Sequence, residues 1–240
     1  EHVAVDGVVA DTDLLLTVQA RDGQELIRYR PEPRREKPLP AAATAPAAPK
    51  DIASNEELYL PGLHLEQYRH ATWDPEPYWQ EALRRDPADV RCNNAVGLTR
   101  FHQGDLAAAE RYFRAAIARW TARNPNPRDG EPYYNLGLTL KLQGRLDEAY
   151  AALYKAIWNY AWQTPGYYAL AEIDCLRADW DAALDHLDRS LLTNAAHLKA
   201  RDLKAAVLRR LGRLAEAEAT ANDTVKMDAL DFWARNEQIL

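Results

Sequence analysis

The chain has 240 residues, enough for one or two domains with a sizeable core. Its composition is 47% hydrophobic and 28% charged, which excludes a disordered chain. The formal net charge of -6 offers no broad basic field for nucleic acid or an anionic membrane. The apolar runs are also far shorter than the roughly 20 residues that span a bilayer. We therefore expect partners that are neither nucleic acids nor membranes.

The two cysteines, Cys92 and Cys175, exclude a disulfide framework and a four-cysteine zinc site. They stand at different points of the pattern described below, which suggests no bond between them. Reduced cysteines favour a cytoplasmic location. The chain opens with Glu1 and its single methionine is Met227, so we expect it to be cut from a longer parent protein.

The first 35 residues predict β structure. Two strand-like runs, 14–20 and 25–30, flank Arg21-Asp22-Gly23-Gln24, where glycine accepts the positive φ of a hairpin turn. So small a sheet has uncovered faces and open edges. We expect residues 1–35 to be the remnant of an upstream β domain, or a piece that packs on the helices or on a second chain in a homodimer. The Pro- and Ala-rich residues 36–53 predict a linker.

From about Ser54 the pattern is helical, and small residues recur with a main period of 34. Glycine inside a helix costs about 1 kcal/mol relative to alanine, so its repetition marks a site that another helix approaches closely. Each unit is therefore a helix pair that must stack on a neighbour to bury its apolar face. We expect an alanine of the second helix to face the small residue of the first, with Phe113, Leu153 and Leu187 beside the contact. The columns are Gly97, Gly137, Ala171, Ala205; Ala109, Ala149, Ala183, Ala217; and the turn glycines Gly104, Gly144, Gly212, with Ala178 in the remaining unit.

The pattern Tyr133-x-x-Leu136-Gly137-x-x-Leu140, then Gly144-x-Leu146-x-x-Ala149-x-x-x-Leu153-x-x-Ala156, resembles the tetratricopeptide repeat (TPR). The resemblance implies an all-α superhelix, a TPR solenoid, over residues 54–240. It implies a degenerate repeat at 56–89, repeats at 90–123, 130–163, 164–197 and 198–231, and a C-terminal cap at 232–240. The degenerate repeat departs from the pattern at Pro61-Gly62. Six extra residues within 121–131 predict a protruding loop.

A narrower resemblance concerns the parent protein. The run from Leu58 to Trp79, with 84–94 after it, is similar to a group of large bacterial proteins. These carry an uncharacterised, carbohydrate-related β-rich domain ahead of a TPR region. The resemblance implies that any catalytic part lies upstream of Glu1, and that this segment could be an accessory module of a glycoside-active enzyme.

The TPR resemblance also implies a concave groove lined by the first helix of each repeat. Aromatic, amide and cationic groups there suit an extended peptide or a sugar-like ligand, whereas ordinary solvated helix positions are the equally weighted alternative. We expect the groove to bind a peptide, a protein or the parent's own upstream domain. The carboxylate clamp of some family members is not expected, because Ala95, Pro165 and Ala169 replace its donors. The expected groove residues are Arg91, Asn94, Leu98, Tyr134, Asn135, Leu138, Lys141, Tyr168, Glu172, Lys199, Asp202 and Arg209.

The aromatic residues Trp158, Tyr160, Trp162, Tyr167 and Tyr168 have two interpretations. They are either a stacking platform for sugar rings or prolines, or packing between repeats. We favour packing, because buried aromatic side chains are usual in helical cores. Exposure of these side chains in one row would favour a ligand.

The sequence indicates neither catalysis nor a metal. His64, Glu66 and His70 lack the three convergent ligands and the spacing of a metal site. Nucleophile-elbow and phosphate-loop motifs do not occur. Acidic residues and a histidine crowd one short helix, which predicts a solvated face, with Arg189 pairing Asp185: these are Asp181, Asp185, His186 and Asp188. We predict a non-enzymatic scaffold without a cofactor.

Overall fold

The computed structural model describes residues 7, 10–33, 44–69, 71–126 and 128–239. The chain divides into two compact units, residues 1–45 and 46–240. The first contains a short 3-10 turn, Asp11–Asp13, and the strands β1 (Leu16–Gln19) and β2 (Glu25–Tyr29). The second contains eleven α-helices in its described residues. Each unit is considered by itself below.

The two strands form the predicted antiparallel hairpin. Leu16 pairs with Tyr29 and Val18 with Ile27, and Gly23 has the positive φ of +86° that the turn requires. Side chains alternate across a strand, so these four apolar residues share one face. All four are exposed. The hairpin thus presents an apolar face that no described residue of its own unit covers.

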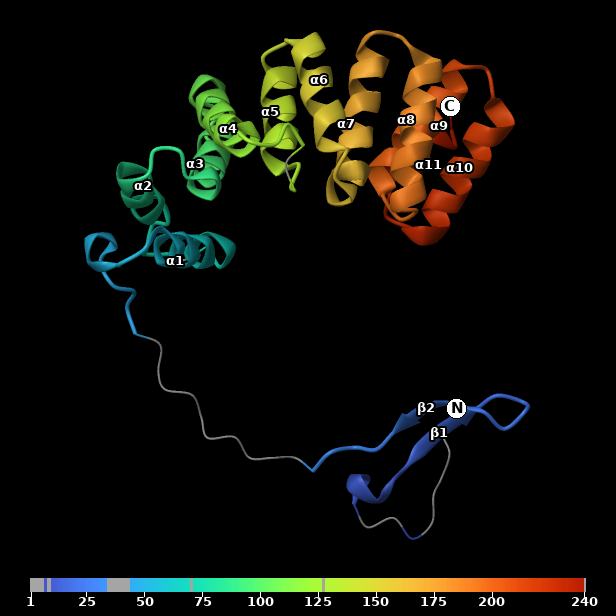
Figure 1. Cartoon of the computed structure of the whole chain (residues 1–240). Helices are drawn as coiled ribbons and strands as arrows, with labels where there is room; N and C mark the ends of the chain where they lie inside the picture. The colour runs from blue at the N-terminus through green and yellow to red at the C-terminus, as the bar shows by residue number, and fades with distance from the viewer. Residues whose placement is uncertain (1–6, 8–9, 34–43, 70, 127, 240) are drawn as a thin grey trace. The chain divides into compact units, whose positions relative to one another are not determined.

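Residues 46–240 form consecutive helix pairs arranged along an arc (Figure 1). Within the pairs the second helix also packs against the first helix of the next pair, and the first helices α1, α3, α5 and α7 contact one another. The first helices therefore make the inner row of the arc. The helices are α1 (Asn55–Gln67), α2 (Glu76–Arg85), α3 (Val90–His102), α4 (Leu106–Thr121), α5 (Glu131–Leu142), α6 (Leu146–Ala156), α7 (Gln163–Leu176), α8 (Trp180–Thr193), α9 (Leu198–Arg210), α10 (Leu214–Met227) and α11 (Phe232–Glu237).

Local sequence signals fix the ends of these helices. Ser54 and Glu57 form a reciprocal capping box at the start of α1, as their spacing indicates. Asp105 and Asp179 accept backbone N–H groups at the starts of α4 and α8. The turns before α4, α6 and α10 place Gly104, Gly144 and Gly212 at φ between +75° and +81°, and Ala178 adopts +58° in the equivalent turn. The turn column of the repeat is thereby confirmed.

The column of small residues inside the first helices is also confirmed. A Cβ on Gly137 would lie 2.6 Å from Leu153 Cγ, and one on Gly97 would lie 2.6 Å from the Phe113 ring. Ala171 and Ala205 are fully buried. One detail is refined: the large side chain of the second helix comes nearest to the glycine, while the alanine of that helix approaches Gly137 through its carbonyl oxygen, 3.3 Å from an added Cβ.

The first helix pair, α1 and α2, also has a small residue of its first helix against a large side chain of its second. α1 continues through Pro61, and Gly62 is buried against Trp79, whose ring leaves no room for an added Cβ. Pro61-Gly62 lies in the helix interior, as the sequence indicates, and the pair still packs closely because Gly62 supplies an approach like that of Gly97. Residues 36–43 of the predicted linker lie outside the described residues. The rest of it is held on α2, where Arg85 donates to the carbonyl of Ile52.

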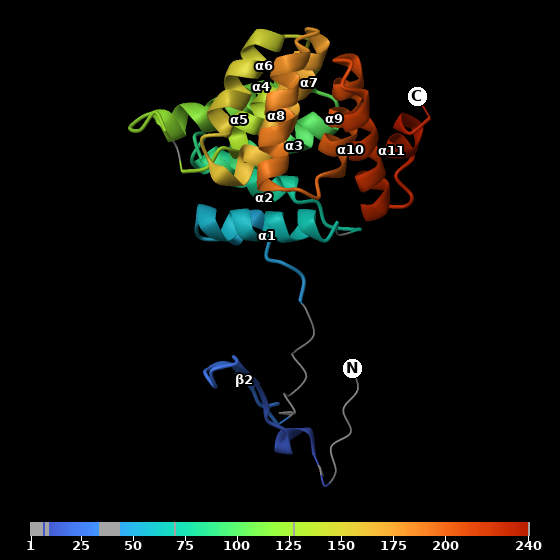
Figure 2. The ribbon, with the colours of Figure 1, turned by 90° about the vertical axis from the view of Figure 1, so that its right-hand side faces the viewer.

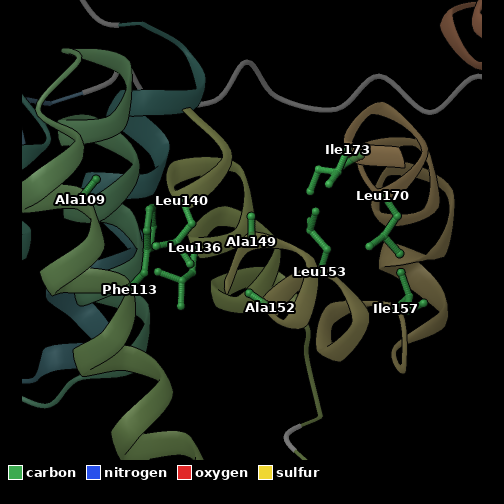
Figure 3. Close-up of a cluster of buried hydrophobic side chains, with 11 residues drawn as sticks. Ala109, Phe113, Leu136, Leu140, Ala149, Ala152, Leu153, Ile157, Leu170 and Ile173 are labelled. Carbon is green, nitrogen blue, oxygen red and sulfur yellow. The ribbon is translucent and has the colours of Figure 1, made fainter. Parts of the chain in front are cut away.

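Leucine and isoleucine side chains fill the spaces between consecutive pairs. Figure 3 shows Phe113 of α4 beside Leu136 and Leu140 of α5, and Leu153 of α6 pointing toward Ile173 of α7. All five are buried. Burial of apolar area of this kind contributes roughly 25 cal/mol per Å², so stacking, rather than any single pair, supplies most of the stability.

We predict that Gly137→Leu lowers the free energy of unfolding by about 1–3 kcal/mol or more, because the new side chain must displace Leu153 or separate α5 from α6. The measurement is a thermal or urea melt. Ala151→Leu is the control, since Ala151 is exposed on α6 and gains the same side chain. An unchanged melt for Gly137→Leu would contradict the role given to this column.

Candidate functional site: a pocket on the inner helices

Five of the expected groove residues meet at one pocket of about 470 Å³. They come from three consecutive first helices: Lys141 from α5, Tyr168 and Glu172 from α7, and Lys199 and Asp202 from α9. We call this site the C-terminal pocket. Its remaining lining consists mainly of apolar side chains, namely Cys175, Leu176, Leu203 and Trp233.

Three more expected residues, Arg91, Asn94 and Leu98, line a smaller pocket of about 100 Å³ between α1 and α3. Arg91 forms an ion pair with Glu56 at 2.6 Å, and its guanidinium lies 4.6 Å from the centre of the Tyr59 ring. Its donors are therefore already engaged within the protein. The structure does not bring this pocket together with the C-terminal pocket.

The other four expected residues serve the packing of the superhelix. Tyr134 stacks on Trp162 with ring centres 5.0 Å apart, and Leu138 packs against the core. Asn135 is buried and donates to the side-chain oxygen of Asn94 at 3.0 Å. Arg209 donates two hydrogen bonds to Glu237 of α11. These side chains have partners inside the protein, which sequence spacing could not reveal.

The polar side chains of the C-terminal pocket differ in whether they have ion-pair or hydrogen-bond partners within the protein. Lys141 Nζ lies 2.5 Å from Glu172 Oε2, so these two charges neutralise each other. Burial and then the neighbouring Glu172 raise the pKa of Tyr168 to about 12. Burial raises the pKa of Cys175 to about 11. The tyrosine and the cysteine are therefore neutral, and neither is an activated nucleophile.

Asp202 is the uncompensated group. It is 8% exposed, and its Oδ1 has no hydrogen-bond partner among the described residues. Burial raises its pKa to about 6, and the charge of Asp231 together with a hydrogen bond to that residue adds to the effect. A buried carboxylate without a partner costs free energy of folding, so its presence at a pocket is a signal of function.

We predict that Asp202→Asn stabilises the protein at pH 8 by about 1–3 kcal/mol, since a rise in pKa from 3.8 to about 6 penalises the ionised folded state. Below pH 3.8 the aspartate is protonated in both the folded and unfolded states, so the gain should vanish there. Denaturant melts across this pH range measure it. The exposed Asp185→Asn is the control, with an expected change within about 0.5 kcal/mol.

Trp233 is the lining residue that sequence reasoning missed. It lies on α11, which packs on α9 and α10 at the C-terminal end of the superhelix (Figure 2). Residues 232–240 were expected only to cap the last repeat. The adjacent pair Phe232-Trp233, whose side chains are 80% and 57% exposed, is the signal that could have found it, because a simple polar cap carries no such pair.

The aromatic run divides between surface and packing. Trp158 and Tyr160 are 66% and 74% exposed, whereas Trp162 donates to Asp129 and Tyr167 packs against the core. They do not form one exposed row. Trp158 lies instead at a pocket of about 240 Å³, beneath the 122–130 segment.

The expected protruding loop is fastened to the helices behind it. Lys155 of α6 donates to the Asn126 side chain at 2.7 Å, and Asn159 donates to the carbonyl of Arg128. Gly130 is buried against the carbonyl of Ala156. The prediction of a loop between the repeats is right, but polar contacts hold its described residues against α6.

His186 is buried, which corrects its assignment to a solvated face. Its Nδ1 lies 2.6 Å from Asp174 Oδ2 and its Nε2 lies 2.9 Å from the Tyr154 hydroxyl. Tyr167 stacks on the ring at 5.8 Å. The spacing to Ala183 and Ser190, three residues before and four after, places His186 on the buried face of α8. This network joins three helices and lines none of the pockets described above.

We predict that His186→Ala lowers stability by about 2–4 kcal/mol, because it leaves the buried Asp174 carboxylate without its partner. Asp185→Ala at the adjacent exposed position should change stability by less than about 0.5 kcal/mol. Urea denaturation of both variants decides the matter. Equal effects would show that the network contributes little.

No group of three histidine, cysteine or carboxylate side chains is placed to hold a metal ion among the described residues. His70, one of the histidines weighed above, lies outside them. Among the same residues no helix has the length and apolar character to cross a bilayer.

The stacked helix pairs, with an inner row of first helices, define a helical-repeat superhelix. Residues 90–158 match the family model described as tetratricopeptide repeat. The helices form the superhelix typical of tetratricopeptide repeats, a fold that is typically non-catalytic.

Solved structures share this fold at low sequence identity. PilW, described as a widely conserved type IV pilus biogenesis factor, has 18% identity and a TM-score of 0.63, covering 76% of this chain and 81% of its own. YrrB, described as a TPR protein with an unusual peptide-binding site, has 14% identity and a TM-score of 0.61, with coverages of 77% and 91%. The pilF structure from Pseudomonas aeruginosa has 18% identity and a TM-score of 0.58, with coverages of 77% and 87%.

Proposed function

We propose that this chain is a non-enzymatic interaction scaffold that binds a peptide segment of a partner protein on its inner helices, centred on the C-terminal pocket. The observation that carries the proposal is the convergence of side chains from α5, α7, α9 and α11 on one mainly apolar pocket. Its volume of about 470 Å³ lies within the roughly 300–1,000 Å³ typical of ligand sites.

The lining suits an extended peptide in two ways. Leu176, Leu203 and Trp233 offer apolar surface for a side chain. Lys199 is exposed and forms no ion pair with a described residue, so its ammonium is available to a carbonyl or carboxylate of the ligand. A solved protein of the same fold, YrrB, is described as having a peptide-binding site, which supports this class of ligand.

The test is a selection of random peptides displayed on phage against the immobilised protein, followed by affinity measurements on the enriched peptides. We predict that the double variant Leu176→Arg, Trp233→Ala weakens their binding at least about 10-fold, because it changes the rim and one wall of the pocket. Both residues are mostly exposed, so the melt should stay close to that of the wild type.

The matched control is Leu192→Arg, Phe232→Ala. It makes the same Leu→Arg change on α8 and a comparable replacement of an aromatic side chain by alanine on α11, at exposed residues that do not line the pocket. Binding should be unaffected. A selection that enriches no peptide, or peptides that bind both double variants equally well, would reject the inner-helix site.

Two alternative functions are suggested by particular surfaces. The exposed Trp158 and Tyr160 near the 122–130 segment favour a carbohydrate-related accessory module, but they lack the continuous row that sugar rings would need. The apolar face of the hairpin favours self-association, although its few side chains offer far less than the roughly 800 Å² per partner of a standard interface. Membership of a longer parent protein remains a prediction from the sequence.

A further inference from the structure

The charges around the C-terminal pocket have partners, with two exceptions. Glu172 is paired with Lys141 at 2.5 Å, and Glu237 accepts from Arg209 at 2.9 Å. Asp231 accepts the backbone N–H of Ala234 and thereby caps α11. The exceptions are Asp202 and Lys199, three residues apart on α9.

Asp202 is more than nine-tenths buried, lines the pocket, and leaves Oδ1 without a hydrogen bond. A carboxyl group that shared a proton with Asp231 would use one of its oxygens and still leave the other unsatisfied. The charge of its neighbour Arg201 lowers the pKa of Asp202 only in part, since that guanidinium donates its hydrogen bonds to Thr224 and to the carbonyl of Ala195. Among the described residues, no lysine or arginine forms an ion pair with Asp202. Asp202 therefore lacks a cationic partner in direct contact, although Lys199 lines the same pocket.

The surroundings of this carboxylate indicate what kind of cation would fit. Leu176, Leu203 and the rings of Tyr168 and Trp233 line the approach to it. Apolar walls favour a long aliphatic stem over a hydrated metal ion, and aromatic rings attract an ammonium or guanidinium by cation–π interaction. No three-ligand cluster for a metal exists among the described residues, which agrees with this choice.

We propose that the C-terminal pocket binds an arginine or lysine side chain of the peptide, with its cationic group on Asp202 and its aliphatic stem against Leu203 and Trp233. The inference rests on the peptide-binding function proposed above and specifies its ligand. Such a contact would replace the missing hydrogen bond and neutralise the buried carboxylate. A site of this kind prefers a cation, whereas the carboxylate clamp of some family members prefers an anion. The donor positions of that clamp are occupied here by Ala95, Pro165 and Ala169, which provide no donors.

The experiment uses two small probes on the whole chain: N-acetyl-arginine methylamide and its citrulline counterpart, which has nearly the same shape without the charge. Binding is followed by NMR titration of the tryptophan indole N–H signals and by calorimetry. The arginine probe should bind saturably and at least about 10-fold more tightly than the citrulline probe. Asp202→Asn should abolish this preference, whereas the exposed Asp185→Asn should retain it.

Three outcomes would overturn the cation site: equal affinity for the two probes, an unchanged preference in Asp202→Asn, or no saturable binding of the arginine probe at millimolar concentration. Asp202→Asn is isosteric and removes a buried charge, so loss of fold would not explain a loss of binding. The two proposals fail separately. Selected peptides that bind in the pocket without needing a cation would refute only the second, and a specific arginine site with no selectable peptide would refute only the first.

Discussion

The whole superhelix depends on the close contact between the two helices of each pair. Where α5 meets α6, Gly137 leaves room for Leu153, and where α3 meets α4, Gly97 leaves room for Phe113. These large side chains pack into the space beside each glycine, so the two helices of a pair lie close together. Each pair can then pack its other face against the next pair. Repeating that geometry aligns the first helices in one inner row, and this row brings residues of three repeats to a common pocket.

The C-terminal pocket exists because the last element differs from the rest. α11 is a single short helix that packs on α9 and α10, and it contributes Trp233 as a wall. It also adds the negative charges of Asp231 and Glu237 near Asp202, while Arg209 is paired with Glu237 and Arg201 donates to Thr224 and the carbonyl of Ala195. Charge compensation therefore fails at one residue, Asp202, and that residue faces the pocket. A buried carboxylate that lowers stability is the kind of compromise that ligand sites require.

Much of the fold could be predicted because the same contact, made by the same kinds of residue, recurs in several repeats. Columns such as Gly97 and Gly137, and turn residues such as Gly104 and Gly144, reveal their role by recurrence. The close-approach role of Gly62 was missed, because its helix also contains Pro61 and a glycine that stands outside the repeated column gives no signal by recurrence. His186 and Trp233 occur in one unit each. Their burial or exposure follows from neighbours such as Asp174, which no periodic pattern identifies.

The same distinction explains why the groove could be predicted only in part. The repeat rule fixes which positions of a first helix lie on the inner row, and it applied to all twelve residues alike. Whether a side chain is available to a ligand depends on whether the protein has already paired it. Asn135 is paired with Asn94, Arg91 with Glu56 and Arg209 with Glu237, and each pairing crosses between helices far apart in the sequence. Lys199 and Asp202 form no ion pair with a described residue, which is why the proposed recognition rests on these two side chains.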